Sequence, residues 1–403
     1  MKSKYIVPLF SVVHFSHHLS TGVLVPLLPL LRQDLGLNYF QAGVLVSSFS
    51  LSYGFGQLPM ALLADRFSSI FLIVIGLIGT SLSSVAVSLT NTYWQMIPCF
   101  IILGLLGGTY HAPAASFLSQ SVPQAQRGRS LGTHTIGGSA SFLLTPVMAV
   151  TIATQASTWR LSFLLLAIPA LVMGILLWFA TRKPHETGQI AERAQLNPPT
   201  GGSNPGTDLA VNPNPTVTWR QIIQVIGVLA LISISMQVVF SSVHSYLPLY
   251  LVDRHGIAPE YAGIVVGLVA GAGIVGAPLG GALSDRMGRK KVILLSLSLA
   301  GPLLFAVIRA SSNLWLSLSL LTYGAIISAR MPAMESLIAD VVPARRRATV
   351  LGIYYLAGQE TAGVLTPLVG RLIDLGSPDP VFAGLAAGLC IISVIALTFR
   401  KRI

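Results

Sequence analysis

Charged residues are scarce in this chain. Only 9% of its 403 residues are Asp, Glu, Lys or Arg, whereas 53% are hydrophobic. A soluble domain carries about 25% charged residues, so the shortage excludes an ordinary soluble protein and predicts a chain embedded in lipid. Twelve helices of about 20 residues fit within this length. We therefore expect an all-α integral membrane protein with twelve transmembrane helices.

Cysteine and enzyme motifs are also nearly absent. Cys99 and Cys390 lie far apart within apolar segments, which excludes a disulfide framework and a cysteine-based metal site. The sequence has no phosphate-binding P-loop, no Gly-x-Ser-x-Gly nucleophile turn and no His-Glu-x-x-His metal pair. We therefore expect neither an enzyme nor an ATP-driven pump, with no cofactor and no bound metal.

Apolar segments of spanning length fill most of the chain. The only long polar stretch, residues 183–218, is rich in Pro, Gly and Asn and is predicted to be a flexible linker. It separates an N-terminal six-helix bundle at 1–182 from a C-terminal six-helix bundle at 219–403. The predicted spans lie at about 6–31, 41–63, 69–89, 94–119, 130–153, 159–181, 221–251, 261–283, 291–309, 314–339, 349–373 and 381–399.

The distribution of the positive charge predicts the topology. The net charge is +12, and the basic residues gather in short clusters between apolar segments, as at 286–291, 345–347 and 400–402. Such clusters mark the cytoplasmic ends of membrane helices. We expect both termini and the linker to face the cytoplasm, in a bacterial-type inner membrane. The bilayer, and not nucleic acid, explains this charge.

The two halves of the chain repeat each other. Asp65-Arg66 recurs as Asp285-Arg286 at an offset of 220 residues, and Ala42-Gly43 recurs as Ala262-Gly263 at the same offset. Six spans per repeat give both halves the same orientation. The repeat therefore predicts two bundles related by a pseudo-twofold axis along the membrane normal, with a central site between them.

One loop resembles the signature of the major facilitator superfamily. Residues 281–291 read Gly-Ala-Leu-Ser-Asp-Arg-Met-Gly-Arg-Lys-Lys, which agrees with the signature at each characteristic position, and residues 61–69 hold a degraded copy. The resemblance implies a secondary active transporter that works by alternating access. It also implies a conformational latch at the cytoplasmic face, for which we predict Asp65, Arg66, Asp285, Arg286, Gly288, Arg289 and Asp340.

A closer resemblance is to the fosmidomycin-resistance group of efflux proteins. It rests on residues 16–19 and 29–31, on Tyr-His-Ala-Pro-Ala-Ala-Ser at 110–116 and on Gly137-Gly138. The resemblance implies proton-coupled export, or antiport, of small amphipathic or anionic organic compounds. One difference from the family weakens the expectation of export. Thr145-Pro146 stands where proton-driven exporters of the superfamily carry a Gly-Pro pair.

Ionisable groups within the spans are few and identify the candidate site. Such groups cost roughly 2.5–3.5 kcal/mol each to insert, so they usually line a functional cavity. Three histidines of the first span share one helix face, either for function or for packing only. Arg330 either contacts an anionic substrate or pairs with Glu335 or Glu360. The predicted cavity residues are His17, His18, Tyr53, His111, Gln237, His244 and Arg330, and the predicted proton-coupling residues are Glu360, Glu335 and His14.

Two other functions remain open at this point. Uptake of an organic anion by proton symport is the first alternative, because Arg330 favours an anion. A non-transporting membrane receptor or enzyme is the remote one, because the loops outside the linker are too short for a soluble catalytic site. The compact layout of six plus six helices needs no partner protein, so we expect a monomer that binds a small solute and protons.

Overall fold

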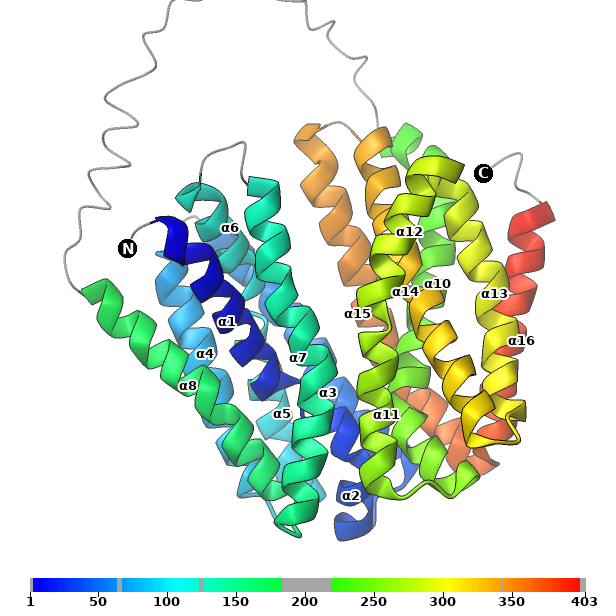
Figure 1. Cartoon of the computed structure of the whole chain (residues 1–403), viewed down its shortest axis with the longest axis horizontal. Coiled ribbons are helices and arrows are strands. Elements are labelled where there is room, and N and C mark those ends of the chain that lie inside the picture. Colours follow the sequence, from blue (N-terminus) through cyan, green and yellow to red (C-terminus); the bar gives the residue numbers. More distant parts are fainter. Residues whose placement is uncertain (1–2, 64–66, 123–126, 183–218, 343, 399–403) are drawn as a thin grey trace, which may run out of the picture.

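The computed structural model describes residues 3–63, 67–122, 127–182, 219–342 and 344–398. The regular secondary structure of these ranges is entirely α-helical, and Figure 1 shows two groups of helices side by side, one from each half of the chain. This arrangement confirms the predicted fold class. The helices of the first half are α1 (Ser3–Thr21), α2 (Leu24–Leu35), α3 (Tyr39–Leu63), α4 (Ser69–Ser88), α5 (Tyr93–Gly107), α6 (His111–Ser121), α7 (Arg127–Gln155) and α8 (Arg160–Arg182).

The second half forms seven helices in the described ranges. The predicted linker and the two latch residues Asp65 and Arg66 lie outside the described residues. Each of the twelve predicted spans overlaps one helix or a consecutive pair of helices. The helices of the second half are α10 (Trp219–His255), α11 (Pro259–Gly271), α12 (Gly273–Met287), α13 (Arg289–Arg309), α14 (Asn313–Val341), α15 (Ala344–Leu375) and α16 (Pro378–Thr398).

Nine helical segments in the described ranges are long and apolar enough to cross a membrane. The segments at the other three predicted spans, α1 with α2, α3, and α15, carry more polar residues. The histidines of α1 and the serines of α3 lower their hydropathy. Of these more polar helices, α3 and α15 pack against each other where the two halves meet.

Three predicted spans are broken near their middle. The first bends at Gly22 and Val23 between α1 and α2, the fourth between α5 and α6, and the eighth at Ala272 between α11 and α12. The break before α6 follows Gly108, where an added methyl group would meet the backbone nitrogen of Gln57 at 2.8 Å. Glycine at this position lets α5 approach α3 backbone to backbone. The break then places His111 at the start of α6.

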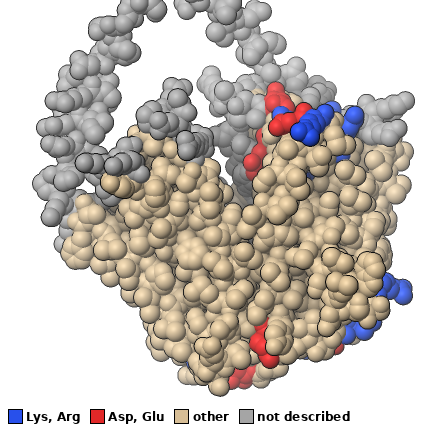
Figure 2. Space-filling model, in the orientation of Figure 1, with Lys and Arg blue, Asp and Glu red and all other residues tan. Residues whose placement is uncertain are grey.

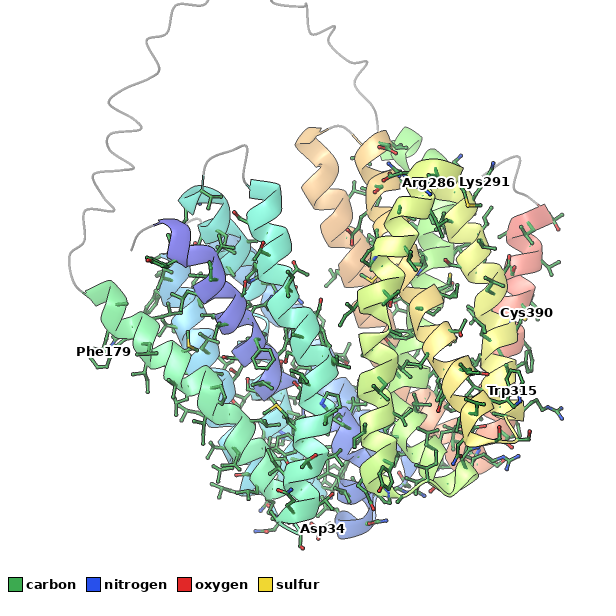
Figure 3. All side chains as sticks on the ribbon, in the orientation of Figure 1. Asp34, Phe179, Arg286, Lys291, Trp315 and Cys390 are labelled. Atoms are coloured by element: carbon green, nitrogen blue, oxygen red, sulfur yellow. The ribbon has the colours of Figure 1, made fainter. Side chains whose placement is uncertain are left out.

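The outer surface matches a lipid environment. Large apolar side chains point outward from the bundle, such as Phe179, which is 61% exposed (Figure 3). Charged side chains in the view of Figure 2 gather at the two ends of the molecule and leave an uncharged band between them. Arg286 and Lys291 lie at the end that carries the termini, and Asp34 and Trp315 lie at the other (Figure 3).

The two halves pack along two seams that are equivalent in the repeat. Helix α3 packs along α15, and α7 packs along α11. Gly43 lies in the first seam, where an added methyl group would be 3.0 Å from the Cα of Pro367. Gly263 lies in the second, where a methyl group would meet the side chain of Val150 in α7 and would be 2.6 Å from the carbonyl oxygen of Pro26 in α2. The repeated glycine thus allows close contact at both seams.

Candidate transport site

A cavity of about 970 Å³ lies between the two halves. Helices α1, α2, α3, α6 and α7 line it from the first half, and α10, α11, α14 and α15 line it from the second. In the space-filling view the surface is hollowed between the halves at the end that carries the termini (Figure 2). The repeat predicts a central site in this position, and the structure contains a cavity of solute size there.

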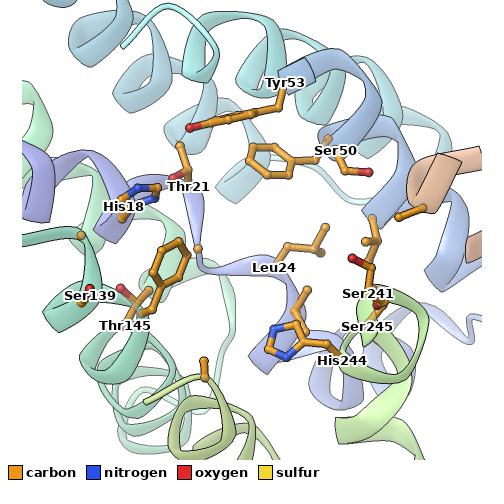
Figure 4. Close-up of a pocket in the computed structure, with 18 of the residues that line it drawn as sticks. His18, Thr21, Leu24, Ser50, Tyr53, Ser139, Thr145, Ser241, His244 and Ser245 are labelled. Atoms are coloured by element: carbon orange, nitrogen blue, oxygen red, sulfur yellow. The ribbon is translucent and has the colours of Figure 1, made fainter. Parts of the chain in front are cut away.

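The lining of the cavity is apolar with scattered hydroxyl and imidazole groups. Figure 4 shows His18 and Tyr53 facing the same space as Ser241 and His244 from the opposite half. Among the described lining residues there is no Lys, Arg, Asp or Glu. The chemistry on offer is therefore hydrogen bonding and apolar contact rather than fixed charge.

Four histidines from three helices meet at the wall formed by the first half. The Nδ1 atom of His14 lies 3.0 Å from the carbonyl oxygen of His134, and its Nε2 atom lies 3.1 Å from Nε2 of His18. The rings of His14 and His134 stack with centroids 4.2 Å apart, and the ring of His111 lies 5.2 Å from that of His14. His111 of α6 and His134 of α7 thus pack against the histidine face that the sequence predicts for the first span.

Two tyrosines, Tyr53 and Tyr110, contact histidines of α1 and α7. Tyr110 is fully buried, stacks on His17 with centroids 4.6 Å apart, and has its hydroxyl 3.0 Å from Nε2 of His134. The hydroxyl of Tyr53 lies 3.3 Å from Nε2 of His17. His17 itself is buried and is not part of the cavity lining, so among the predicted helix 1 histidines only His14 and His18 reach the cavity.

Arg330 lies inside the wall of the second half rather than in the cavity. Its side chain is only 1% exposed, and it donates to the carbonyl oxygen of Ser233 at 3.0 Å, the hydroxyl of Tyr354 at 2.7 Å and the amide oxygen of Gln237 at 3.0 Å. It also contacts the Ser233 hydroxyl. Neither Arg330 nor Gln237 is part of the cavity lining, although both were predicted to be. The guanidinium is held by neutral acceptors that fix its position.

The end of the molecule opposite the termini is closed by contacts that join the two halves. Arg32 of α2 forms an ion pair with Asp253 of α10, and the Tyr39 hydroxyl donates to the same carboxylate at 2.7 Å. The backbone N–H groups of Tyr39 and Phe40 donate to Asp374 at 2.9 and 2.8 Å. Asp374 of the second half thereby caps the N-terminus of α3 in the first half. The sequence does not single out these carboxylates, because their partners lie in the other half of the chain.

The end that carries the termini has ion pairs within the second half. Arg289 contacts Asp285, its side chain donates to Asp340 at 3.3 Å, and it also donates to the Ser284 hydroxyl at 3.0 Å. The structure therefore brings together Asp285, Arg289 and Asp340 of the predicted latch. Their role in switching between states stays a prediction.

Three further predicted residues, His244, Glu335 and Glu360, lie in the second half. His244 lines the cavity from α10, and its Nδ1 atom is buried without a hydrogen-bond partner among the described residues. Glu335 lies half-buried in α14. The backbone of Glu360 lies in α15, but its side chain is outside the described residues. His134, Ser241 and Ser245 also line the cavity but were not among the predicted cavity residues.

This combination of fold and central cavity defines a secondary transporter with two pseudo-symmetric halves. The sequence profile of the Major Facilitator Superfamily matches residues 10–359 and 229–402. The chain therefore belongs to the Major Facilitator Superfamily.

Known relatives agree with this assignment. The chain is 26% identical to the hexuronate transporter of Bacillus subtilis (strain 168), covering 92% of this chain and 87% of that protein. It is 20% identical to the fosmidomycin resistance protein of Escherichia coli (strain K12), covering 94% and 88%. The crystal structure of a D-xylose-proton symporter matches the fold with a TM-score of 0.77 at 17% identity, covering 98% and 96%. These relatives are transporters, which confirms the prediction that the chain is not an enzyme.

Proposed function

We propose that this transporter exports small amphipathic organic compounds in exchange for protons. The observation that carries the proposal is the cavity of about 970 Å³, whose described lining is apolar with imidazole and hydroxyl groups and without Lys, Arg, Asp or Glu. Such a lining favours solutes with a large apolar surface and a few hydrogen-bonding groups. The likeness to the fosmidomycin resistance protein supports export.

The direction in which the cavity opens fits the substrate-accepting state of an exporter. The clusters of basic residues support a topology in which the termini face the cytoplasmic side of a bacterial-type inner membrane. The surface hollow lies at the end that carries the termini (Figure 2), and the cross-half contacts of Asp253 and Asp374 close the other end. We therefore interpret the structure as a monomer open to the cytoplasm, ready to take up a solute from that side.

The carboxyl groups within the spans are the candidates for proton coupling. Of the 13 Asp and Glu residues, Glu335 and Glu360 are the two that lie well inside spanning helices. A carboxyl group that is protonated in one state and ionised in the other links proton flow to solute flow. Glu360 is the first candidate, because it lies at the middle of α15, and Glu335 is the second.

A second function is uptake of an organic anion by proton symport. The likeness to a hexuronate transporter favours it, as does the buried cation Arg330 next to the cavity wall. Arg330 would then have to leave its neutral partners and turn toward the solute. In the present state its hydrogen bonds to Ser233, Tyr354 and Gln237 hold it away from the cavity.

Transport in inverted membrane vesicles distinguishes the two functions. A fluorescent amphipathic dye and a radiolabelled sugar acid are tested separately, after a thermal-shift screen has ranked solutes by binding. With an acidic vesicle interior, an exporter accumulates the dye while protons leave. Glu360→Gln, which mimics the protonated carboxyl group at nearly the same volume, should abolish this accumulation. Movement of the sugar acid in the same direction as protons, without dye transport, would establish uptake instead.

A further inference from the structure

Three imidazole side chains meet at one end of the cavity. His14 and His18 are four residues apart on α1, and His111 is the first residue of α6. One possible metal-ligand atom from each of the three lies within 4.8 Å of the other two. We propose that His14, His18 and His111 bind a divalent transition-metal cation of the zinc class, with an open coordination position toward the cavity. This site goes beyond the proposed export and does not depend on the direction of transport.

The orientation of His14 is that of a metal ligand. Its Nδ1 atom lies 3.0 Å from the carbonyl oxygen of His134, and a carbonyl group only accepts hydrogen bonds. The proton of the neutral ring is therefore on Nδ1, which leaves the lone pair on Nε2. Histidines that bind metals almost always donate their second ring N–H to a carbonyl or carboxylate in this way. The backbone of α7 thus fixes the tautomer that ligation needs.

The spacing of His14 and His18 suits a tetrahedral cation. Two nitrogens bound to tetrahedral zinc at about 2.0–2.1 Å lie about 3.3 Å apart. The two Nε2 atoms are 3.1 Å apart in the structure. Without a metal one of them donates a hydrogen bond to the other. A shift of the His18 proton to Nδ1 presents two lone pairs to one point with almost no movement of either ring.

His111 is available as the third ligand. It makes ring contacts with His14, His17 and His18, at centroid distances of 5.2, 5.7 and 5.4 Å, and no hydrogen bond to it occurs among the described residues. It is half-buried and lines the cavity, so its ring is open to a solute or ion on that side. Pro113 follows within the first turn of α6, where a missing N–H costs no helical hydrogen bond.

The ligand chemistry selects the class of cation. Three neutral imidazoles suit zinc, nickel, cobalt and copper, whereas magnesium and calcium require oxygen ligands. The described lining of the cavity contains no carboxylate that could supply such oxygens. Three histidines with one open position are also the pattern of zinc sites that exchange a fourth ligand.

The test is direct binding of zinc to the purified full-length protein. The protein in detergent is treated with a chelator, dialysed and titrated with Zn²⁺ by calorimetry. One saturable site per chain is expected, with no competition from excess Mg²⁺. His14→Gln, His18→Gln and His111→Gln should each weaken binding by more than the about 10–100-fold that follows loss of a hydrogen-bond partner of a ligand. His255→Gln, at the far end of α10, is the control and should leave zinc binding unchanged.

A spectroscopic measurement keeps the proposal falsifiable if the variants fold poorly. Wild-type protein loaded with Co²⁺ should show the intense visible absorption bands of a four-coordinate site with nitrogen ligands, and Zn²⁺ should remove them. Two results would show that the histidines form a hydrogen-bonded cluster and not a metal site. One is a spectrum with nothing but the weak bands of six-coordinate Co²⁺, and the other is zinc binding that persists when His14, His18 and His111 are all replaced by Gln.

Discussion

The two halves of this transporter place different chemistry at equivalent positions. The offset of 220 residues pairs Tyr110 with Arg330 and His134 with Tyr354. In the first half, the Tyr110 hydroxyl contacts His134 at 3.0 Å beside imidazoles that are open to the cavity. In the second half, the guanidinium of Arg330 contacts Tyr354 at 2.7 Å inside the wall. The network of the first half therefore lies next to the cavity lining, while the network of the second half lies between helices within the wall.

The difference shows how a duplicated fold acquires an asymmetric function. Both networks join the first and fourth spans of their half to the fifth. The first half fills these positions with neutral rings, whereas the second uses a cation with several neutral acceptors. The same asymmetry holds for the carboxyl groups, because Glu335 and Glu360 correspond to Ala115 and Ala140 in the first half. The predictions below test this division between the halves.

The largest effect is expected for Arg330→Gln. The shorter side chain loses the hydrogen bonds that the guanidinium donates to the Ser233 carbonyl group and the Tyr354 hydroxyl, and a hydrogen bond from a charged group contributes about 1.5–3 kcal/mol. We expect a loss of about 3 kcal/mol or more in stability, measured as the melting temperature in detergent. Tyr110→Phe at the equivalent position removes two neutral hydrogen bonds, to Phe10 and His134, and should cost about 1–2 kcal/mol. Equal shifts in the two variants would contradict the division between the halves.

The next effect concerns proton coupling. Glu360→Gln should reduce flux driven by a pH gradient by at least about a hundredfold, or roughly 2.7 kcal/mol, because the amide cannot exchange a proton. Substrate binding should persist with a weaker dependence on pH between pH 5.5 and 8.5. Glu335→Gln serves as the comparison in the neighbouring helix. If wild type and Glu360→Gln keep the same pH dependence of binding, coupling has to be assigned elsewhere.

A smaller effect is expected at the signature loop. The Asp285 side chain is 69% exposed, so its pair with Arg289 contributes under about 1 kcal/mol to folding. Asp285→Asn should therefore leave the melting temperature nearly unchanged and still slow transport about tenfold, roughly 1.4 kcal/mol, if the loop is a latch. Asp65→Asn in the degraded copy should slow it less. Normal flux in Asp285→Asn would show that the loop does not control the transition between states.

The smallest effect is expected at the closed end. Asp374 accepts two backbone N–H groups of α3, and Asp374→Asn replaces charged acceptors by a neutral amide, which should weaken closure by about 1 kcal/mol. A cysteine at Ser50, in a variant without Cys99 and Cys390, should then react faster with a membrane-impermeant reagent added from outside. Thr154→Val is the matched control at the equivalent position, because Thr154 donates only within its own helix, to Val150 at 2.9 Å. Unchanged labelling in Asp374→Asn would mean that this cap does not hold the end closed.

Local patterns in the sequence predict the helices, but contacts between distant helices decide the site. Hydropathy and the repeat predict the spans and the two halves, and the 3.6-residue period predicts that the histidines of the first span share a face. The period cannot reveal that His111 and His134 join them, because that contact depends on the packing of α1, α6 and α7. It also cannot show that Arg330 turns into the wall, since Ser233 and Gln237 lie on another helix. The breaks in three spans likewise depend on contacts between helices that are distant in the sequence.

The paired seams around Gly43 and Gly263 have a mechanical consequence. Each seam lies one turn from the start of its helix, near the closed end, and the two lie on opposite sides of the pseudo-twofold axis. Because the two halves touch along two seams, they can rock about the direction that joins the seams. They resist rotation about the pseudo-twofold axis. Because glycine has no side chain to rearrange, the contacts can loosen and re-form without a change of rotamer at either position. The repeated glycines thus let the two halves approach closely at two positions that the pseudo-twofold axis relates.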